Sequence, residues 1–330
     1  MIALLLTACL ADLGERSVGA HAGRCGDCHA DHSEAFATSR HAAAATSPLF
    51  VALRAEAQAT AELGSFCDRC HAPAGGDGLS CVTCHGAAGA HGDGNGALID
   101  DPTGPVRGPF GGNDGPHASE RSDFLTDSQL CAACHQVDGP GAFHETPYDH
   151  WARSQAAERG ERCQDCHQSP TPGVATKRPR APIVDGGPPR PIGDHGFVGL
   201  QTDPVALLRA GVTLQSIPGG VRLTNHAGHA LPDGAAFTRE LWLQGRTAAG
   251  DYLDPVVALH PQLTMGGRPT HDPLHADRVV ARGLDPDEVR DVTLAGDEIC
   301  LRFRPVAEPL ARAVGLPVPP AITVRCVPGL

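Results

Sequence analysis

Residues 81–85 read Cys-Val-Thr-Cys-His, and this spacing, two cysteines three positions apart with a histidine directly after the second, occurs five times before residue 170. Chance alone would produce about 0.03 such matches in a chain of this composition. The five copies are Cys25, Cys28 and His29; Cys67, Cys70 and His71; Cys81, Cys84 and His85; Cys131, Cys134 and His135; and Cys163, Cys166 and His167. Because this repeat is far above chance, we expect the chemistry of these cysteines and histidines to determine the fold.

The spacing matches the chemistry of covalent haem attachment. Two thiols three residues apart can add to the two vinyl groups of one haem, and the adjacent histidine then reaches the iron from the proximal side. The rival interpretations are zinc, because two C-x-x-C pairs can form a tetrahedral four-cysteine site, and disulfides. Five pairs are an odd number for zinc, and a zinc ribbon gives no reason for a histidine after every pair. The sequence therefore predicts five covalently attached haem c groups.

The composition agrees with a core filled by cofactor. Only 4% of the 330 residues are aromatic, although 41% are hydrophobic. Five macrocycles would supply the flat apolar bulk that the side chains lack, so we expect the haem-binding half not to fold without haem. The chain also has 40 Gly and 29 Pro, which predicts many loops and little long helix.

The charge indicates which partners to expect. The net charge is −12 with histidine neutral, which makes nucleic acid an unsuitable partner. Haem propionates would add to this negative charge, so we expect redox protein partners with basic docking patches and association that weakens with salt. No apolar run approaches the roughly 20 residues of a membrane-spanning helix, which predicts a soluble body.

Each iron needs a second axial ligand or an open face. Met265 is the only methionine besides Met1 and cannot serve five irons, whereas 18 histidines less five proximal ones leave 13. The expectation is therefore bis-histidine, low-spin, low-potential haems. The candidate distal ligands, chosen by their spacing from the motifs, are His41, His91, His117, His195 and His229. Reserve candidates are His21, His144, His150 and His226, and His32 is expected to face solvent or a propionate.

Four stretches resemble one family. Residues 25–41 contain C-x-x-C-H followed by aromatic-x-x-S-x-H, residues 80–91 contain C-H-G-x-x-x-x-H, residues 146–154 lead into the fifth motif, and residues 225–234 read Asn-His-Ala-Gly-His-Ala-Leu-Pro-Asp-Gly. They are similar to multihaem c-type cytochromes of the broad group that includes the tetrahaem electron carrier of the hydroxylamine-oxidation pathway. The resemblance implies electron transfer, closely stacked haem pairs, and axial roles for His41, His91 and His229. This chain departs from the pattern in having five haem sites and Asp233 where threonine is usual.

Three regions are expected along the chain. Residues 1–20 resemble a bacterial lipoprotein signal and tether in which Cys9 becomes acylated, with a plain secretory signal or a buried cysteine as the alternatives. Residues 21–200 form the pentahaem domain with a Pro-rich connector at 169–193, and residues 205–330 form a β domain with alternating strands. The fold class is α+β: a helix-and-loop multihaem domain packed around five haems, then a small antiparallel β-sandwich-like domain. Haem attachment of this kind requires export, so the expected location is the periplasm or the outer membrane, including its extracellular surface.

Local signals predict particular elements. Ser47 and Pro48 open a helix that ends near Gly64, and Thr146 and Pro147 open another that stops at Gly160. Val212-Thr-Leu-Gln-Ser-Ile217 and Val221-Arg-Leu-Thr224 form a hairpin. A disulfide is expected between Cys300 and Cys326, which lie on two further strands of an exported protein.

The leading functional hypothesis is an electron carrier that is not an enzyme. One alternative is a haem enzyme acting on a small nitrogen or sulfur species at one open iron, which needs polar groups above that iron. Catalytic relatives often carry Lys in place of the motif histidine, and all five motifs here keep His. Another alternative is self-assembly into an extracellular haem filament, in which His21 would ligate a haem of the next subunit.

Overall fold

The computed structural model describes residues 17–61, 63–76, 78–110, 117–168, 193–197, 203 and 205–330. Cys9 and all of the Pro-rich connector except Gly193 lie outside the described residues, so the predictions made for them stay predictions. The chain divides into two compact units. Unit 1 comprises Met1–Phe50, Gly64–Cys134 and Arg162–Gln201, and unit 2 comprises Val51–Leu63, His135–Glu161 and Thr202–Leu330.

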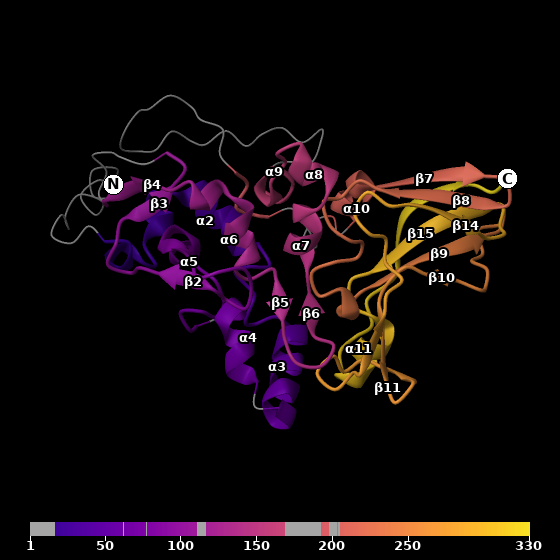
Figure 1. The fold of residues 1–330 in the computed structure, drawn as a ribbon, viewed down its shortest axis with the longest axis horizontal. Helices are drawn as coiled ribbons and strands as arrows, with labels where there is room; N and C mark the ends of the chain where they lie inside the picture. Colours follow the sequence, from indigo (N-terminus) through magenta and orange to yellow (C-terminus); the bar gives the residue numbers. More distant parts are fainter. Residues whose placement is uncertain are drawn as a thin grey trace, which may run out of the picture. The chain divides into compact units, whose positions relative to one another are not determined.

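Unit 1 consists of short helices joined by loops and two-stranded ladders (Figure 1). Its α-helices and 3-10 helices are η1 (Gly19–His21), η2 (Cys25–Asp27), α2 (Ala30–Ala37), α4 (Gly64–His71), α5 (Cys81–His85), η3 (Phe124–Thr126), α6 (Ser128–Ala132) and α9 (Cys163–His167). Its strands are β1 (Ala87–Ala90), β2 (Leu98–Asp100), β3 (Val106–Gly108) and β4 (Ser119–Arg121). The β1–β2 pair is antiparallel and the β3–β4 pair is parallel.

The two predicted long helices have different outcomes. Helix α3 (Pro48–Ala61) begins at the expected proline and ends three residues before Gly64, close to the prediction. The helix expected from Thr146 to Gly160 is instead two short helices, α7 (Pro147–Ala152) and α8 (Gln155–Glu158). The chain is extended at Ser154, whose hydroxyl accepts a hydrogen bond from the Ala157 amide and so caps a new helix there.

Unit 2 is mainly antiparallel sheet. Strands β7 (Val212–Ile217) and β8 (Gly220–Asn225) form the predicted hairpin, and β14 (Val289–Thr293) pairs with the other edge of β8. A second sheet has the order β10-β9-β15-β16, from β9 (Glu240–Arg246), β10 (Val257–Ala258), β15 (Glu298–Arg304) and β16 (Ile322–Pro328). The remaining elements are β5 (Val137–Asp138), β6 (His144–Glu145), α10 (Ala206–Gly211), η4 (Ala236–Thr238), β11 (Gln262–Met265), β12 (Arg268–Thr270), β13 (Arg278–Val280) and α11 (Glu308–Ala313).

Alternation along these strands places apolar side chains in the interior of unit 2. Leu223 on β8, Leu243 on β9 and Ile299 on β15 are fully buried. The β14-β8-β7 sheet and the four-stranded sheet are drawn close together in Figure 1, and Ser216 on β7 donates a hydrogen bond to the Pro328 carbonyl on β16. Aliphatic residues at period-two spacing therefore form the core here, whereas unit 1 has few large buried side chains among its described residues.

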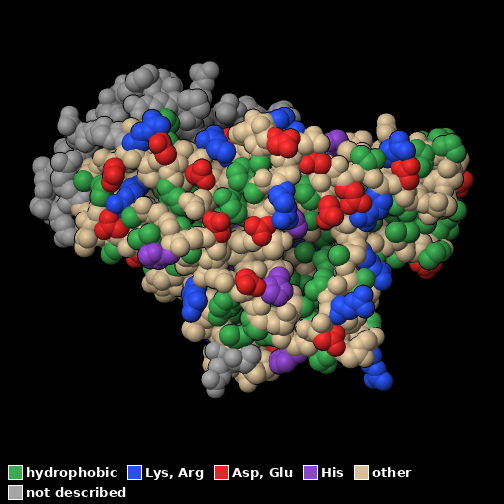
Figure 2. All heavy atoms as spheres, viewed as in Figure 1, with side chains coloured by type: hydrophobic (Ala, Val, Ile, Leu, Met, Phe, Trp, Pro, Cys, Tyr) green, Lys and Arg blue, Asp and Glu red, His purple; other side chains and the backbone are tan. Residues whose placement is uncertain are grey.

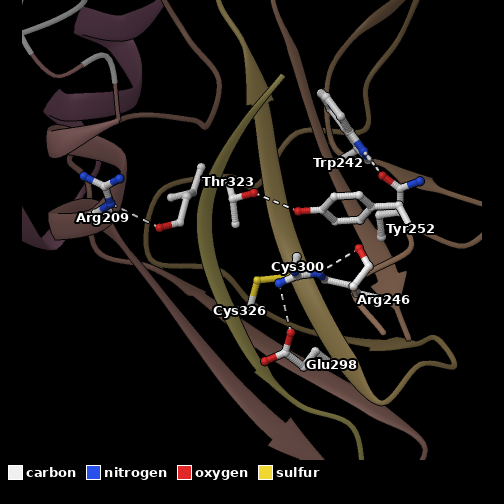
Figure 3. Close-up of a disulfide and its surroundings, with 11 residues drawn as sticks. Arg209, Trp242, Arg246, Tyr252, Glu298, Cys300, Thr323 and Cys326 are labelled. Carbon is white, nitrogen blue, oxygen red and sulfur yellow. Dashed lines mark hydrogen bonds and ion pairs between the residues drawn. A yellow bond between two sulfur atoms is a disulfide. The ribbon is translucent and has the colours of Figure 1, made fainter. Parts of the chain in front are cut away.

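The predicted disulfide is present (Figure 3). Cys300 and Cys326 lie directly opposite each other on β15 and β16, with a Cα–Cα distance of 4.0 Å. Beside them the Tyr252 hydroxyl hydrogen-bonds the Thr323 hydroxyl at 2.9 Å, and the guanidinium of Arg302 lies 3.8 Å from the centre of the Tyr252 ring. This cross-link joins an edge strand to the centre of its sheet.

The structure confirms a mixed α and β protein with several small antiparallel sheets. Packing around haem and the exact domain limits stay predictions. Within the described ranges, no helix has the length and apolarity that crossing a membrane demands.

Candidate haem-binding site

The cysteines and histidines of three of the five motifs lie on short helices. Cys67 to His71 end helix α4, Cys81 to His85 form α5, and Cys163 to His167 form α9. On a helix the residues i, i+3 and i+4 share one face, so both thiols and the imidazole of a motif are directed to the same side. One side presenting two sulfurs and one ring nitrogen is the donor set that covalent haem attachment needs.

Capping interactions explain why these very short helices form. Before α5, the amide of Ser80 donates to the Thr83 hydroxyl at 3.0 Å. Before α9, the amide of Arg162 donates to the Asp165 carboxylate at 2.8 Å. Each interaction satisfies an amide that a helix start would otherwise leave unpaired. The first motif lies on η2 and the residues after it, and Cys131 of the fourth lies on α6.

Thiols of different motifs lie in direct contact within unit 1. The Cys25 thiol hydrogen-bonds the Cys81 thiol, which lowers the pKa of Cys81 to about 6 and raises that of Cys25. In the same way Cys70 pairs with Cys134, and Cys131 pairs with Cys163, whose pKa is lowered to about 7 by this hydrogen bond. Motif one therefore adjoins motif three, and motif four adjoins motifs two and five.

Five histidines gather in a first cluster, from segments far apart in the sequence. The ring centres of His29 and His117 are 6.4 Å apart, those of His85 and His195 are 6.1 Å apart, and those of His32 and His195 are 4.7 Å apart. The structure thus brings two predicted proximal ligands together with two predicted distal ligands. It also places half-buried His32 in this cluster, so of the two positions expected for His32 the one beside a propionate fits better than the one facing solvent.

A second cluster surrounds His41. The His41 ring packs on the ring of Phe197 at 4.3 Å between centres, and the His71 ring stacks on Phe50 at 3.9 Å. Burial, together with the nearby His167 and His71, lowers the pKa of His41 to about 4. A lowered pKa keeps an imidazole neutral at pH 7, and the neutral ring is the form that coordinates a metal.

Backbone carbonyls orient several of the predicted ligands. The Nδ1 atoms of His71, His85, His195 and His229 lie 2.9, 2.6, 3.0 and 2.8 Å from the carbonyl oxygens of Ala44, Arg107, Gly193 and Ala230, respectively. A carbonyl oxygen can only accept, so Nδ1 carries the proton and Nε2 holds the lone pair. This is the orientation in which metal-binding histidines are usually held.

Arg107 contacts the third motif through both its backbone carbonyl and its guanidinium. Its carbonyl accepts the His85 hydrogen bond, while its guanidinium donates to the Gly86 carbonyl at 3.1 Å and pairs with Asp101 at 2.7 Å. Arg107 lies on β3 and is buried, so the position of His85 depends on a paired interior charge. Nothing in the sequence around Arg107 indicated this role.

The other predicted distal ligands lie elsewhere. His91 directly follows β1 and is exposed. His229 belongs to unit 2, where the buried Asn225 side chain donates to its carbonyl oxygen at 2.9 Å. The motif residues Cys166, His29 and His135 are exposed, and the other motif cysteines are half-buried. The ligand roles of all these residues stay predictions.

Near His229 the structure adds a pair that sequence reasoning did not identify. The carboxylate of Asp233 accepts a hydrogen bond from Nδ1 of His150 at 2.9 Å and lies 3.9 Å from Nδ1 of His229. This carboxylate raises the pKa of His150. The sequence held one indication of this pair, which is Asp233 at a position where the family resemblance expects threonine.

Comparison with known proteins shows the fold. No family model and no curated protein sequence matches the chain. Among solved structures, it is similar to the crystal structure of a penta-heme cytochrome c552 from Thermochromatium tepidum, with a TM-score of 0.67 and 18% sequence identity over 94% of this chain and 98% of the other. The prediction that the chain is not an enzyme is corrected by this finding, because a likeness in fold to this cytochrome does not support a carrier alone. The chain shares the fold of a multihaem c-type cytochrome.

Proposed function

We propose that the chain is an exported c-type cytochrome that binds five covalent haems and transfers electrons through them. The observation that carries this proposal is the coincidence of five C-x-x-C-H motifs with two clusters of histidines contributed by distant segments. The residues present fit the group: four motifs offer two thiols and a proximal imidazole, and neutral imidazoles are available as second ligands. In the first motif Cys28 is disulfide-bonded in this structure, so that bond must be reduced before a haem attaches there. When bound, each haem would supply a one-electron couple at its iron.

The contacts between motifs support conduction from haem to haem. Haems held by Cys25 and Cys81, by Cys70 and Cys134, or by Cys131 and Cys163 would be neighbours, since their attachment points touch. The chain's own contribution is to hold each motif on a capped helical turn, and to exclude water with residues such as Phe50 and Phe197.

The charge of the chain supports protein partners with basic docking patches. On the face shown in Figure 2, acidic and basic side chains are interspersed, and acidic residues outnumber basic ones by 38 to 26 in the whole chain. We extend the proposal to anchoring through Cys9 in the periplasm or outer membrane. Self-assembly through His21 is a further outcome that size measurements of the purified protein would show.

Haem content tests the proposal directly. The chain, expressed with the haem-attachment machinery, should carry five haems by intact mass and by pyridine haemochrome absorbance, and no zinc. Replacing Cys81 and Cys84 with alanine should remove one haem. The matched control, alanine at Cys300 and Cys326, should leave all five, because that pair forms a disulfide. A wild-type chain with zinc and no haem would overturn the proposal.

A further inference from the structure

We propose that the first-motif haem is ligated by His29 and His117, and that the third-motif haem is ligated by His85 and His195. This assignment rests on the proposed covalent attachment of haem. It names which distant segment completes each of the two sites. The argument uses ring separations, ring orientation and the position of each histidine in the chain.

The separation of the rings is the first step. A metal–imidazole bond is about 2.0 Å long, and a ring nitrogen lies about 1.1 Å from the ring centre when ring bonds are about 1.3–1.4 Å. Two imidazoles on opposite sides of one metal therefore have centres about 6.2 Å apart. The observed separations are 6.4 Å for His29 and His117, and 6.1 Å for His85 and His195.

Other histidine pairs of this cluster do not fit. His32 and His195 are 4.7 Å apart, which is too close for a metal between them. His29 and His32 are 6.0 Å apart, but they are three residues apart at the start of α2. Side chains at i and i+3 of a helix emerge on the same face, so they cannot approach a planar macrocycle from opposite sides. His32 therefore lies beside the two haems without ligating either.

Ring orientation gives the second step. Nδ1 of His85 is held by the Arg107 carbonyl and Nδ1 of His195 by the Gly193 carbonyl. Nδ1 of His117 faces the Ser119 hydroxyl at 3.1 Å and the Ala118 carbonyl at 3.3 Å. These contacts leave Nε2 directed away from the backbone, as in a metal ligand. By contrast, His226 uses Nε2 for the Thr213 hydroxyl at 2.7 Å.

The assignment differs from the one implied by the family resemblance, in which His91 would serve a neighbouring haem. His91 and His29 are both exposed, so the ring separation rather than burial favours His117, which is half-buried with its ring centre 6.4 Å from that of His29. The ligand of the first haem therefore comes from the segment before β4, and that of the third haem from the segment after the Pro-rich connector.

The test uses the full haem-loaded chain and its ferric EPR spectrum. His117→Ala and His195→Ala should each convert one of five irons from low-spin to high-spin, and the double variant should convert two. His32→Ala and His226→Ala are matched controls that should add no high-spin iron. A high-spin iron in His32→Ala, or none in His117→Ala or His195→Ala, would overturn the assignment.

A second background identifies the iron. In a chain that lacks the first haem through Cys25→Ala and Cys28→Ala, His117→Ala should add no high-spin iron, while His195→Ala should still add one. The opposite result would overturn the assignment. If that chain does not fold, His117→Met in the intact chain should raise the midpoint potential of a single haem, and an unchanged potential would refute it. The haem count of the wild type distinguishes the proposed attachment of five haems from the proposed ligand assignment. If the wild type carries five haems but the variants do not show the expected spin states, only the ligand assignment is refuted.

Discussion

Asn225 provides the strongest test of how the predicted ligand loop of unit 2 is held. It ends β8 and is 1% exposed. Its Nδ2 donates toward the carbonyls of His229, Leu284 and Asp285 at 2.9, 3.1 and 2.9 Å, and its Oδ1 accepts from the Ala227 amide at 2.8 Å. One side chain thus joins the loop that carries His229 to the segment before β14.

Asn225→Leu keeps the branched shape and the number of side-chain heavy atoms and removes all four contacts. A net contribution of about 1 kcal/mol for each hydrogen bond gives a loss of about 3–4 kcal/mol, and buried carbonyls left without a donor keep the cost high. Asn225→Asp should be at least as harmful, because it places a carboxylate against three carbonyl oxygens. The loss is measured as the change in free energy of unfolding in urea, followed by circular dichroism of the haem-loaded chain.

The matched control is Gln215→Leu, the same amide-to-leucine change at an exposed position of β7. It should change the free energy of unfolding by less than about 0.5 kcal/mol. If Asn225→Leu falls within that range as well, the carbonyl contacts do not stabilise the loop and the reasoning is refuted.

Three further predictions concern residues of unit 2, one of them with a control in unit 1. Replacing Cys300 and Cys326 with alanine removes a cross-link between residues 26 positions apart, which frees the unfolded chain. The free energy of unfolding, measured with urea, should fall by about 3.5 kcal/mol. A loss under about 1 kcal/mol would contradict a stabilising role for the disulfide. Burial raises the pKa of Glu145 to about 7 from an ordinary 4.5, so the folded state holds this proton more tightly than the unfolded state. The free energy of unfolding therefore falls as pH rises between these two values. Glu145→Gln should flatten that part of the curve of stability against pH, and an unchanged curve would contradict the raised pKa. A Cβ on Gly228 would lie 3.1 Å from an indole carbon and 3.2 Å from a methyl group, so Gly228→Val should cost about 1–3 kcal/mol by urea unfolding, whereas Gly108→Ala, with nothing within 4 Å, should be nearly neutral.

Features encoded locally were predictable. The hairpin of β7 and β8 follows from alternation around Pro218-Gly-Gly, and the start of α3 follows from Ser47 and Pro48. The Cys300–Cys326 cross-link required only two strands and an exported protein. The motifs themselves could be read from spacing alone, since attachment chemistry acts within five consecutive residues.

Features that join distant segments were not predictable. Sequence spacing could nominate His117 and His195 but could not pair them with His29 and His85, because that pairing depends on how loops fold back. The break at Ser154 was missed because the same hydroxyl can cap a helix or lie within one, and tertiary contacts decide. His32 was expected to face solvent or a propionate, and the sequence could not choose between these positions, because the ring of His195 that lies beside it comes from a distant segment.

The central claim is that five irons sit in this fold between pairs of histidines. The most direct measurement is the EPR spectrum of the ferric protein as isolated, with haem and iron quantified on the same sample. Five haems per chain with every iron low-spin is the predicted result. Fewer than five haems, or a high-spin signal from one iron in five, would contradict the claim, and the second outcome would direct ligand and substrate screening to that iron.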